Sequence, residues 1–149
     1  FSDAVDAALL MQESAKAAGI EINVIREPDD GYWSNVWLKK PWSMCYWGGR
    51  PTVDTMLSIS LAADAPWNDT HFKSARFNEL LVQARSELDE AKRAAMYAET
   101  QQIVHDDGGQ VVLMFYNFVG ALNTAVAHGE LNSDQDSDGG YMMERWWMA

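Results

Sequence analysis

The spacing of apolar residues along the chain predicts a helix followed by a strand at the N-terminal end. In the stretch SDAVDAALLMQ, Val5 and Leu9 recur at helical spacing, and Gly19 is placed to end the helix. The next run, IEINVIREP, alternates Ile20 and Ile22 with polar residues, which is the period of a strand. The two patterns therefore predict a helix that leads into the first strand of a sheet.

A second strand is predicted after a short helical stretch. Pro28 breaks the first strand, YWSNVWLKK has apolar residues on one helical face, and Pro41 stops that helix. The run WSMCYW then indicates a strand that is buried on both sides. Because a crossover through a helix makes its two strands parallel, this region predicts a βαβ unit.

The rest of the chain predicts three more helices and one long strand. TVDTMLSISL has a helical period, and two further helices begin at Ser74 and Asp89, the second of them closing at Gly108 or Gly109. After them, QVVLMFYNFVGAL is typical of a long buried strand. Taken together, these elements predict an α/β fold with a mixed sheet and flanking helices.

The end of the second strand is the candidate binding site. Ligands of open α/β sheets gather outside the carboxyl ends of the strands, which is where Trp47, Gly48 and Arg50 stand. Glycines there let the backbone approach a ligand, and an arginine can present a planar fork to a carboxylate or phosphate. The alternative is an ordinary turn in which Arg50 pairs with Asp54 in solvent.

Tryptophan is abundant, with seven residues in a chain of 149. Most of them are expected in the core, but Trp47 and Trp67 are the best candidates for the flat apolar walls of a small-molecule site. The single cysteine, Cys45, excludes an internal disulfide and is expected to be a small buried hydrophobe.

The net charge excludes several classes of partner. With 11 basic and 22 acidic residues the chain carries −11, which disfavours nucleic acid and an anionic membrane surface. No spacing of histidines predicts zinc, and no nucleophile motif predicts an enzyme. The run from Asp134 begins like a calcium loop, but Arg145 replaces its final glutamate, which favours a solvated acidic loop. We therefore expect no catalytic residue, no metal and no cofactor.

Three stretches of the chain carry a resemblance to a known family. They are AAGIEINVIREPDDGYWSNVW, YWGGRPTVDTMLS, and the long run RFNELLVQARSELDEAKRAAMYAETQQIVHDDGGQVVLMFYNFVGAL. Together they resemble the C-terminal part of the family 5 extracellular solute-binding proteins, the peptide-, opine- and nickel-binding receptors of ABC importers.

The resemblance implies that residues 1–149 are a partial solute-binding domain of a larger two-lobed receptor. The implied partners are a small peptide-like ligand, the permease subunits of the importer and the missing N-terminal part of the receptor. The implied location is the periplasm or the outer face of the cytoplasmic membrane. Of the family's WxxD motif, Trp47 and Gly48 are retained, whereas Arg50 stands in place of the aspartate, so an acidic ligand group is favoured over a free amine. Asp54 is a further candidate ligand-binding residue, since it could take the amine if the loop is rearranged.

Two other classes of function stay open. Many tryptophans and carboxylates are also typical of a carbohydrate-active enzyme or a carbohydrate-binding module, in which an acid pair would face an aromatic groove. A structural interaction domain would instead present a large exposed apolar patch without a pocket.

Overall fold

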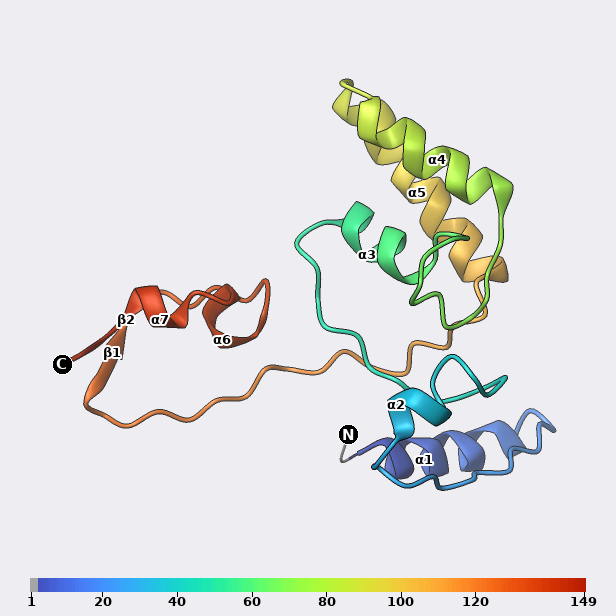
Figure 1. The fold of residues 1–149 in the computed structure, drawn as a ribbon, viewed down its shortest axis with the longest axis horizontal. Helices are drawn as coiled ribbons and strands as arrows, with labels where there is room; N and C mark the ends of the chain where they lie inside the picture. The colour runs from blue at the N-terminus through green and yellow to red at the C-terminus, as the bar shows by residue number, and fades with distance from the viewer. Residues whose placement is uncertain (1–2) are drawn as a thin grey trace.

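The computed structural model describes residues 3–149 as a helical body joined by an extended segment to a small C-terminal unit (Figure 1). Helices follow one another along most of the chain, and the two strands lie near its end. Their bounds are α1 Ala4–Lys16, α2 Tyr32–Asn35, α3 Val53–Ser60, α4 Ala75–Ser86, α5 Glu90–Asp107, β1 Val126–His128, α6 Asp136–Gly139, α7 Met142–Arg145 and β2 Trp146–Met148.

The predicted mixed α/β sheet with flanking helices is wrong. Among residues 3–149 the sheet has two short strands, β1 and β2, which pair antiparallel with Ala127 opposite Trp147. The predicted crossover is also absent, since the stretch between Pro28 and Pro41 forms only the single turn of α2. The architecture is therefore mostly helical.

The three segments that were predicted as strands are not paired into a sheet. Residues 20–28, 43–50 and 110–122 have no regular secondary structure and no strand partner among the described residues. Figure 1 shows 110–122 crossing alone from the end of α5 to β1. Alternation or apolar character predicts an extended backbone, but a strand also needs a neighbour that supplies its hydrogen bonds.

The helices α3, α4 and α5 form the core of the body. Thr52, Ser74 and Asp89 each accept a hydrogen bond from a backbone N–H in the first turn of the helix that follows, which confirms the helix starts predicted at Ser74 and Asp89. The buried residues of the main cluster come from α3, α4 and the loop between them: Leu57, Leu61, Phe72, Phe77 and Leu81. Phe72 and Phe77 meet edge to face, with ring centroids 5.4 Å apart.

Asn68 holds the loop between α3 and α4 against this core. Its buried side-chain amide donates to the carbonyl oxygens of Ala62 at 3.2 Å and of Phe72 at 2.7 Å. Its Oδ1 accepts from the backbone N–H of Phe72 at 3.1 Å and from the hydroxyl of Thr70 at 3.1 Å. One side chain therefore supplies hydrogen-bond partners to backbone groups near both ends of a loop that has no regular secondary structure.

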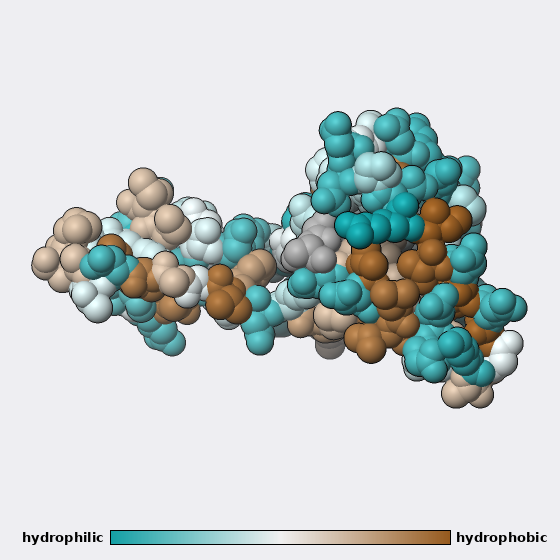
Figure 2. Space-filling view, turned by 90° about the horizontal axis from the view of Figure 1, so that it is seen from below, coloured by the Kyte–Doolittle hydropathy of each residue, from teal (hydrophilic) through white to brown (hydrophobic). Residues whose placement is uncertain are grey.

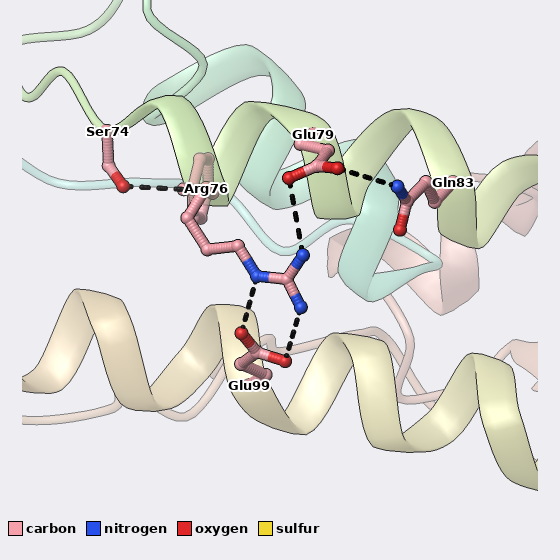
Figure 3. A network of polar contacts seen from close by, with 6 residues as sticks. Ser74, Arg76, Glu79, Gln83 and Glu99 are labelled. Carbon is pink, nitrogen blue, oxygen red and sulfur yellow. Dashed lines mark hydrogen bonds and ion pairs between the residues drawn. The ribbon is translucent and has the colours of Figure 1, made fainter.

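An exposed ion pair joins α4 to α5 across their outer surface (Figure 3). Arg76 donates from Nε to Glu99 at 2.7 Å and from Nη2 to the other Glu99 oxygen at 3.0 Å. Nη1 of Arg76 also donates to Glu79, whose second oxygen accepts from Gln83. The hydrogen bond from Arg76 lowers the pKa of Glu99, so the carboxylate is ionised and the two-pronged contact is formed at neutral pH.

The C-terminal unit is organised around Asp138, so the predicted solvated acidic loop is wrong at this residue. The Asp138 side chain is only 2% exposed and pairs with Arg145 at 2.8 Å. It also accepts from the backbone N–H of Asn132 at 2.6 Å and from the indole of Trp146 at 3.1 Å. Loop, helix and strand are thereby joined at one carboxylate.

Apolar side chains remain on the surface of both parts. Figure 2, seen from the α1 side, shows them gathered on the helical body and again along the narrower C-terminal arm. Leu10 and Ile25 are exposed in the first region, and Phe115 and Val119 are exposed on the way to the second. None of the helices described between residues 3 and 149 is both long enough and apolar enough to cross a membrane.

We predict that Asn68→Ala destabilises the helical body by about 1–3 kcal/mol, because it leaves buried backbone groups without their partners. The measurement is the free energy of unfolding from urea denaturation. Asn35→Ala is the matched control, since Asn35 is exposed in α2. Equal stability of the two variants would contradict the role assigned to Asn68.

We also predict that acid opens the C-terminal unit. The Asn132 backbone hydrogen bond, helped by Trp146 and Arg145, holds the pKa of Asp138 below its usual value. Its contribution to stability is therefore complete above the ordinary aspartate pKa of about 3.9 and is lost as the pH falls through the lower folded pKa.

The measurement is amide exchange of residues 126–148 as a function of pH. Asp138→Asn should weaken protection at neutral pH and flatten its acid dependence, whereas the exposed Asp134→Asn should leave both unchanged. An unaltered acid profile in Asp138→Asn would contradict this prediction.

Candidate functional site

Three tryptophans, a cysteine and an aspartate form a polar and aromatic cluster beside the predicted site. Asp69 Oδ2 accepts from the indole of Trp37 at 2.9 Å, from the thiol of Cys45 at 3.2 Å and from the indole of Trp47 at 3.4 Å. The last distance is at the long end for an N–H donor. We call Trp37, Cys45, Trp47, Trp67 and Asp69 the tryptophan cluster.

The rings of the cluster pack directly on one another. The centroids of Trp47 and Trp67 are 6.2 Å apart, and each lies 6.4 Å from Trp37 in tilted or edge contacts. Trp67 keeps 43% of its surface exposed, so the cluster has one open side. The structure therefore brings together Trp47 and Trp67, the two tryptophans predicted to line a site.

Sequence reasoning missed Asp69 as the residue that binds this cluster. A partly buried indole or thiol needs an acceptor, and in this chain the acceptor comes from the loop that Asn68 holds. Gln110 donates to the other oxygen, Oδ1, at 3.4 Å. The indole N–H groups of Trp37 and Trp47 each need an acceptor, and in a chain rich in carboxylates this need could have indicated a nearby aspartate or glutamate.

Cys45 is a donor within the cluster, and its thiol is strongly protected from ionisation. Burial first, and then its hydrogen bond to the Asp69 carboxylate, raise the pKa of the thiol to about 12. A thiol with so high a pKa is protonated at neutral pH and is a poor nucleophile. Cys45 was expected to be a small buried hydrophobe, but it is only partly buried and donates a hydrogen bond to a carboxylate.

Arg50 lies at the end of the segment that carries Cys45 and Trp47. Its Nη1 donates to the carbonyl oxygens of Gly48 at 2.9 Å and of Gly49 at 3.1 Å, so the guanidinium folds back over its own backbone. The alternative pairing of Arg50 with Asp54 is not formed.

Asp54 instead binds Arg85, which donates from Nε to both carboxylate oxygens at 3.0 and 3.1 Å. Arg85 also donates to Ser58, so this contact ties α3 to α4. The carboxylate of Asp54, a predicted site residue, therefore links α3 to α4.

A small pocket opens beside Arg50. It has a volume of about 140 Å³ and is lined by Gly48, Gly49, Arg50, Phe118, Gln135 and Asp136. We call it the Arg50 pocket. It lies where the end of segment 43–50 meets the C-terminal unit, and a side chain at Gly49 would come within 3.3 Å of the Asp134 carbonyl oxygen. Residues 118, 135 and 136 were not predicted to lie here, because only the tertiary structure brings them to Arg50.

A larger pocket of about 400 Å³ lies at the end of α1, against Gln12, Lys16 and residues 19–22. Lys16 is already paired with Glu13 at 2.5 Å, and Gln12 donates to the Ile22 carbonyl oxygen. This pocket has no aromatic wall and holds none of the predicted site residues. The Arg50 pocket is therefore the stronger candidate.

Two further findings bear on what the site can do. Within residues 3–149, no group of three or more histidine, cysteine, aspartate or glutamate residues is arranged to hold a metal ion. No family model, curated protein or solved structure matches the chain. The functional argument therefore depends on the side chains of the site and on the resemblance carried by the sequence.

We predict that Cys45 reacts slowly with disulfide reagents in the folded protein. At about pH 8 its rate should be lower than that of free cysteine by on the order of a hundredfold or more, because so little thiolate is present. Asp69→Asn should speed the reaction by removing the neighbouring negative charge. The exposed Asp64→Asn is the control, and a rate unchanged by Asp69→Asn would contradict the assigned contact.

Proposed function

We propose that this chain is part of the substrate-binding component of an ABC importer. It captures a small peptide-like or amino-acid-like solute outside the cytoplasmic membrane, in the periplasm or tethered to the outer face, and delivers it to the permease subunits. The chain performs no chemistry on the ligand. The observation that carries the proposal is the Arg50 pocket, which joins a cation, an acid and an aromatic ring at the end of the segment that holds Trp47.

The state of the Arg50 guanidinium supports binding of an anionic group. Its described contacts both use Nη1 and both go to uncharged carbonyl oxygens of its own backbone. Arginine carries five N–H donors, so the remaining ones are available to a carboxylate in a two-pronged contact. In a chain of net charge −11, Arg50 also offsets the repulsion that an anionic ligand meets on approach.

The negative charge of Asp136, opposite to that of Arg50, further restricts the class of ligand that fits the pocket. Asp136 lines the same pocket as Arg50, together with the amide of Gln135 and the ring of Phe118. A ligand with a carboxylate at Arg50 and a donor group, such as an ammonium, at Asp136 would satisfy both charges. This pairing favours the zwitterionic head of an amino acid or of a related derivative.

The size of the pocket sets how much of the ligand it takes. Pockets that enclose a whole drug-sized ligand are typically about 300–1,000 Å³, and this one is about 140 Å³. It therefore accepts one polar end of the solute, and the rest extends outward. Trp67, at the exposed side of the tryptophan cluster, can pack against an apolar part of a longer ligand.

The experiment is calorimetry with a panel of free amino acids and short peptides, each with a free or a blocked carboxylate. We predict that Arg50→Ala weakens binding by roughly 1.5–3 kcal/mol, the cost of a lost charged hydrogen bond. Arg50→Lys should recover only part of it, because an ammonium cannot present the planar fork.

Arg26→Ala is the matched control, since Arg26 is exposed and lies away from the pocket in sequence. Ligand recovered after binding should be chemically unchanged by mass spectrometry. Binding that is insensitive to Arg50→Ala, or any turnover of the bound solute, would contradict the proposed function.

A further inference from the structure

Asp69, the carboxylate of the tryptophan cluster, has no cationic partner within residues 3–149. Its hydrogen-bond donors are two indoles, a thiol and an amide, all of which are uncharged. The carboxylates of Asp54 and Asp138, by contrast, each pair with an arginine. A partly buried carboxylate is costly unless a positive charge compensates it. The cluster therefore carries a negative charge that the described residues leave uncompensated.

The three indoles beside Asp69 are tilted against one another. Their planes differ by 55–67°, and their centroids form a triangle with sides of 6.2–6.4 Å. A group about 2.5 Å above the middle of this triangle lies about 4.4 Å from each centroid, inside the ~6 Å range of a cation–π contact. Trp67 is 43% exposed, and Trp37 and Trp47 are partly exposed, so solvent reaches the rings. One small cation can therefore contact all three.

We propose that the tryptophan cluster binds the quaternary ammonium group of a small, freely dissolved solute. Tryptophan gives the strongest cation–π contact of the aromatic residues, and several such rings together are the usual means of recognising a methylated ammonium. The Asp69 carboxylate supplies the opposite charge. The net charge of −11 also favours the approach of a cation.

The hydrogen bonds of the cluster select a methylated cation over a primary ammonium. A primary ammonium brings three N–H donors, and each needs an acceptor when water is displaced. Asp69 Oδ2 already accepts from three donors, and Oδ1 accepts from Gln110 at 3.4 Å. The indoles themselves are donors only. A quaternary ammonium has no N–H group, so its methyl groups can pack on the rings without leaving a donor unpaired.

This site is separate from the Arg50 pocket of the proposed function. None of the residues that line the pocket belongs to the tryptophan cluster. Choline carries a quaternary ammonium and no carboxylate, so its binding reports on the cluster. The panel of amino acids and peptides with free or blocked carboxylates reports on the Arg50 pocket. Either site can therefore fail its test while the other passes.

The first experiment is calorimetry of the full chain with choline at constant ionic strength. It is repeated with the uncharged analogue of choline in which a carbon atom replaces the nitrogen. We expect choline to bind more tightly by about fivefold or more, because both molecules make the same apolar contacts but only choline adds the cation–π attraction. Ammonium chloride should show no binding. Equal affinity for choline and its analogue, no binding of choline, or equal binding of ammonium would each overturn the proposal.

Variants place the binding at the cluster. Trp67→Leu should weaken choline binding by about fivefold or more, and Trp67→Phe should retain part of it, because phenylalanine keeps an aromatic face. Trp42→Leu is the matched control, since Trp42 is 60% exposed and makes no ring contact with the cluster among the described residues. Equal choline affinity of Trp67→Leu and Trp42→Leu would contradict the proposal.

The role of the Asp69 charge has its own test. Asp69→Asn should weaken binding of choline and leave binding of the uncharged analogue unchanged, because the substitution removes a charge and keeps the size of the side chain. Choline affinity equal to that of the parent chain, or the same loss for choline and for the analogue, would overturn the electrostatic role assigned to Asp69.

Phosphatidylcholine carries the same head group on a membrane surface, so a further measurement distinguishes the two sources. The full chain is mixed with phosphatidylcholine vesicles and centrifuged, with and without free choline. We expect the chain to stay in solution, because Trp67 is the only one of the three rings that is largely open. Vesicle binding that free choline displaces would overturn the choice of a freely dissolved solute.

Discussion

The backbone's need for hydrogen-bond partners is the constraint on which this structure depends. A helix satisfies its own N–H and C=O groups, so α3, α4 and α5 fold against one another with caps supplied by neighbouring side chains. An extended segment cannot satisfy its own N–H and C=O groups and needs a neighbouring strand to do so. Residues 20–28, 43–50 and 110–122 have backbones and apolar side chains suited to strands, yet no neighbour among the described residues provides the ladder. That difference explains why the helices pack into a body whereas the extended segments stay without strand partners.

The parts of the fold that could be predicted are those determined locally. Ser74 and Asp89 cap their helices because each acceptor lies within one turn of the donor it satisfies, and both residues precede a helical pattern. The buried residues of α4 recur at helical spacing, and they are Phe77, Leu80, Leu81 and Ala84. The mixed sheet failed because strand pairing is not local: apolar character indicates which residues can be extended, but it does not supply the partner.

The candidate site likewise contains residues that could be predicted from local sequence and residues that could not. Trp47 and Arg50 could be named from the glycines and the change of pattern after Cys45, which are features of one short stretch. Asp69 could not, because its role appears only when the loop held by Asn68 brings a carboxylate to Trp37 and Cys45. The Arg50 pocket could be predicted even less, since Phe118 comes from the extended segment 110–122 and Asp136 comes from the C-terminal unit beyond it.

The tryptophan cluster also gives the protein an optical property. Trp37, Trp47 and Trp67 lie with ring centroids 6.2–6.4 Å apart, close enough for excitation absorbed by one indole to pass to its neighbours. The Asp69 carboxylate accepts from the N–H groups of Trp37 and Trp47, so a change at Asp69 alters the surroundings of two of these indoles. Three of the seven tryptophans of the chain lie at this site, so a change in the cluster alters the intrinsic fluorescence without an attached dye.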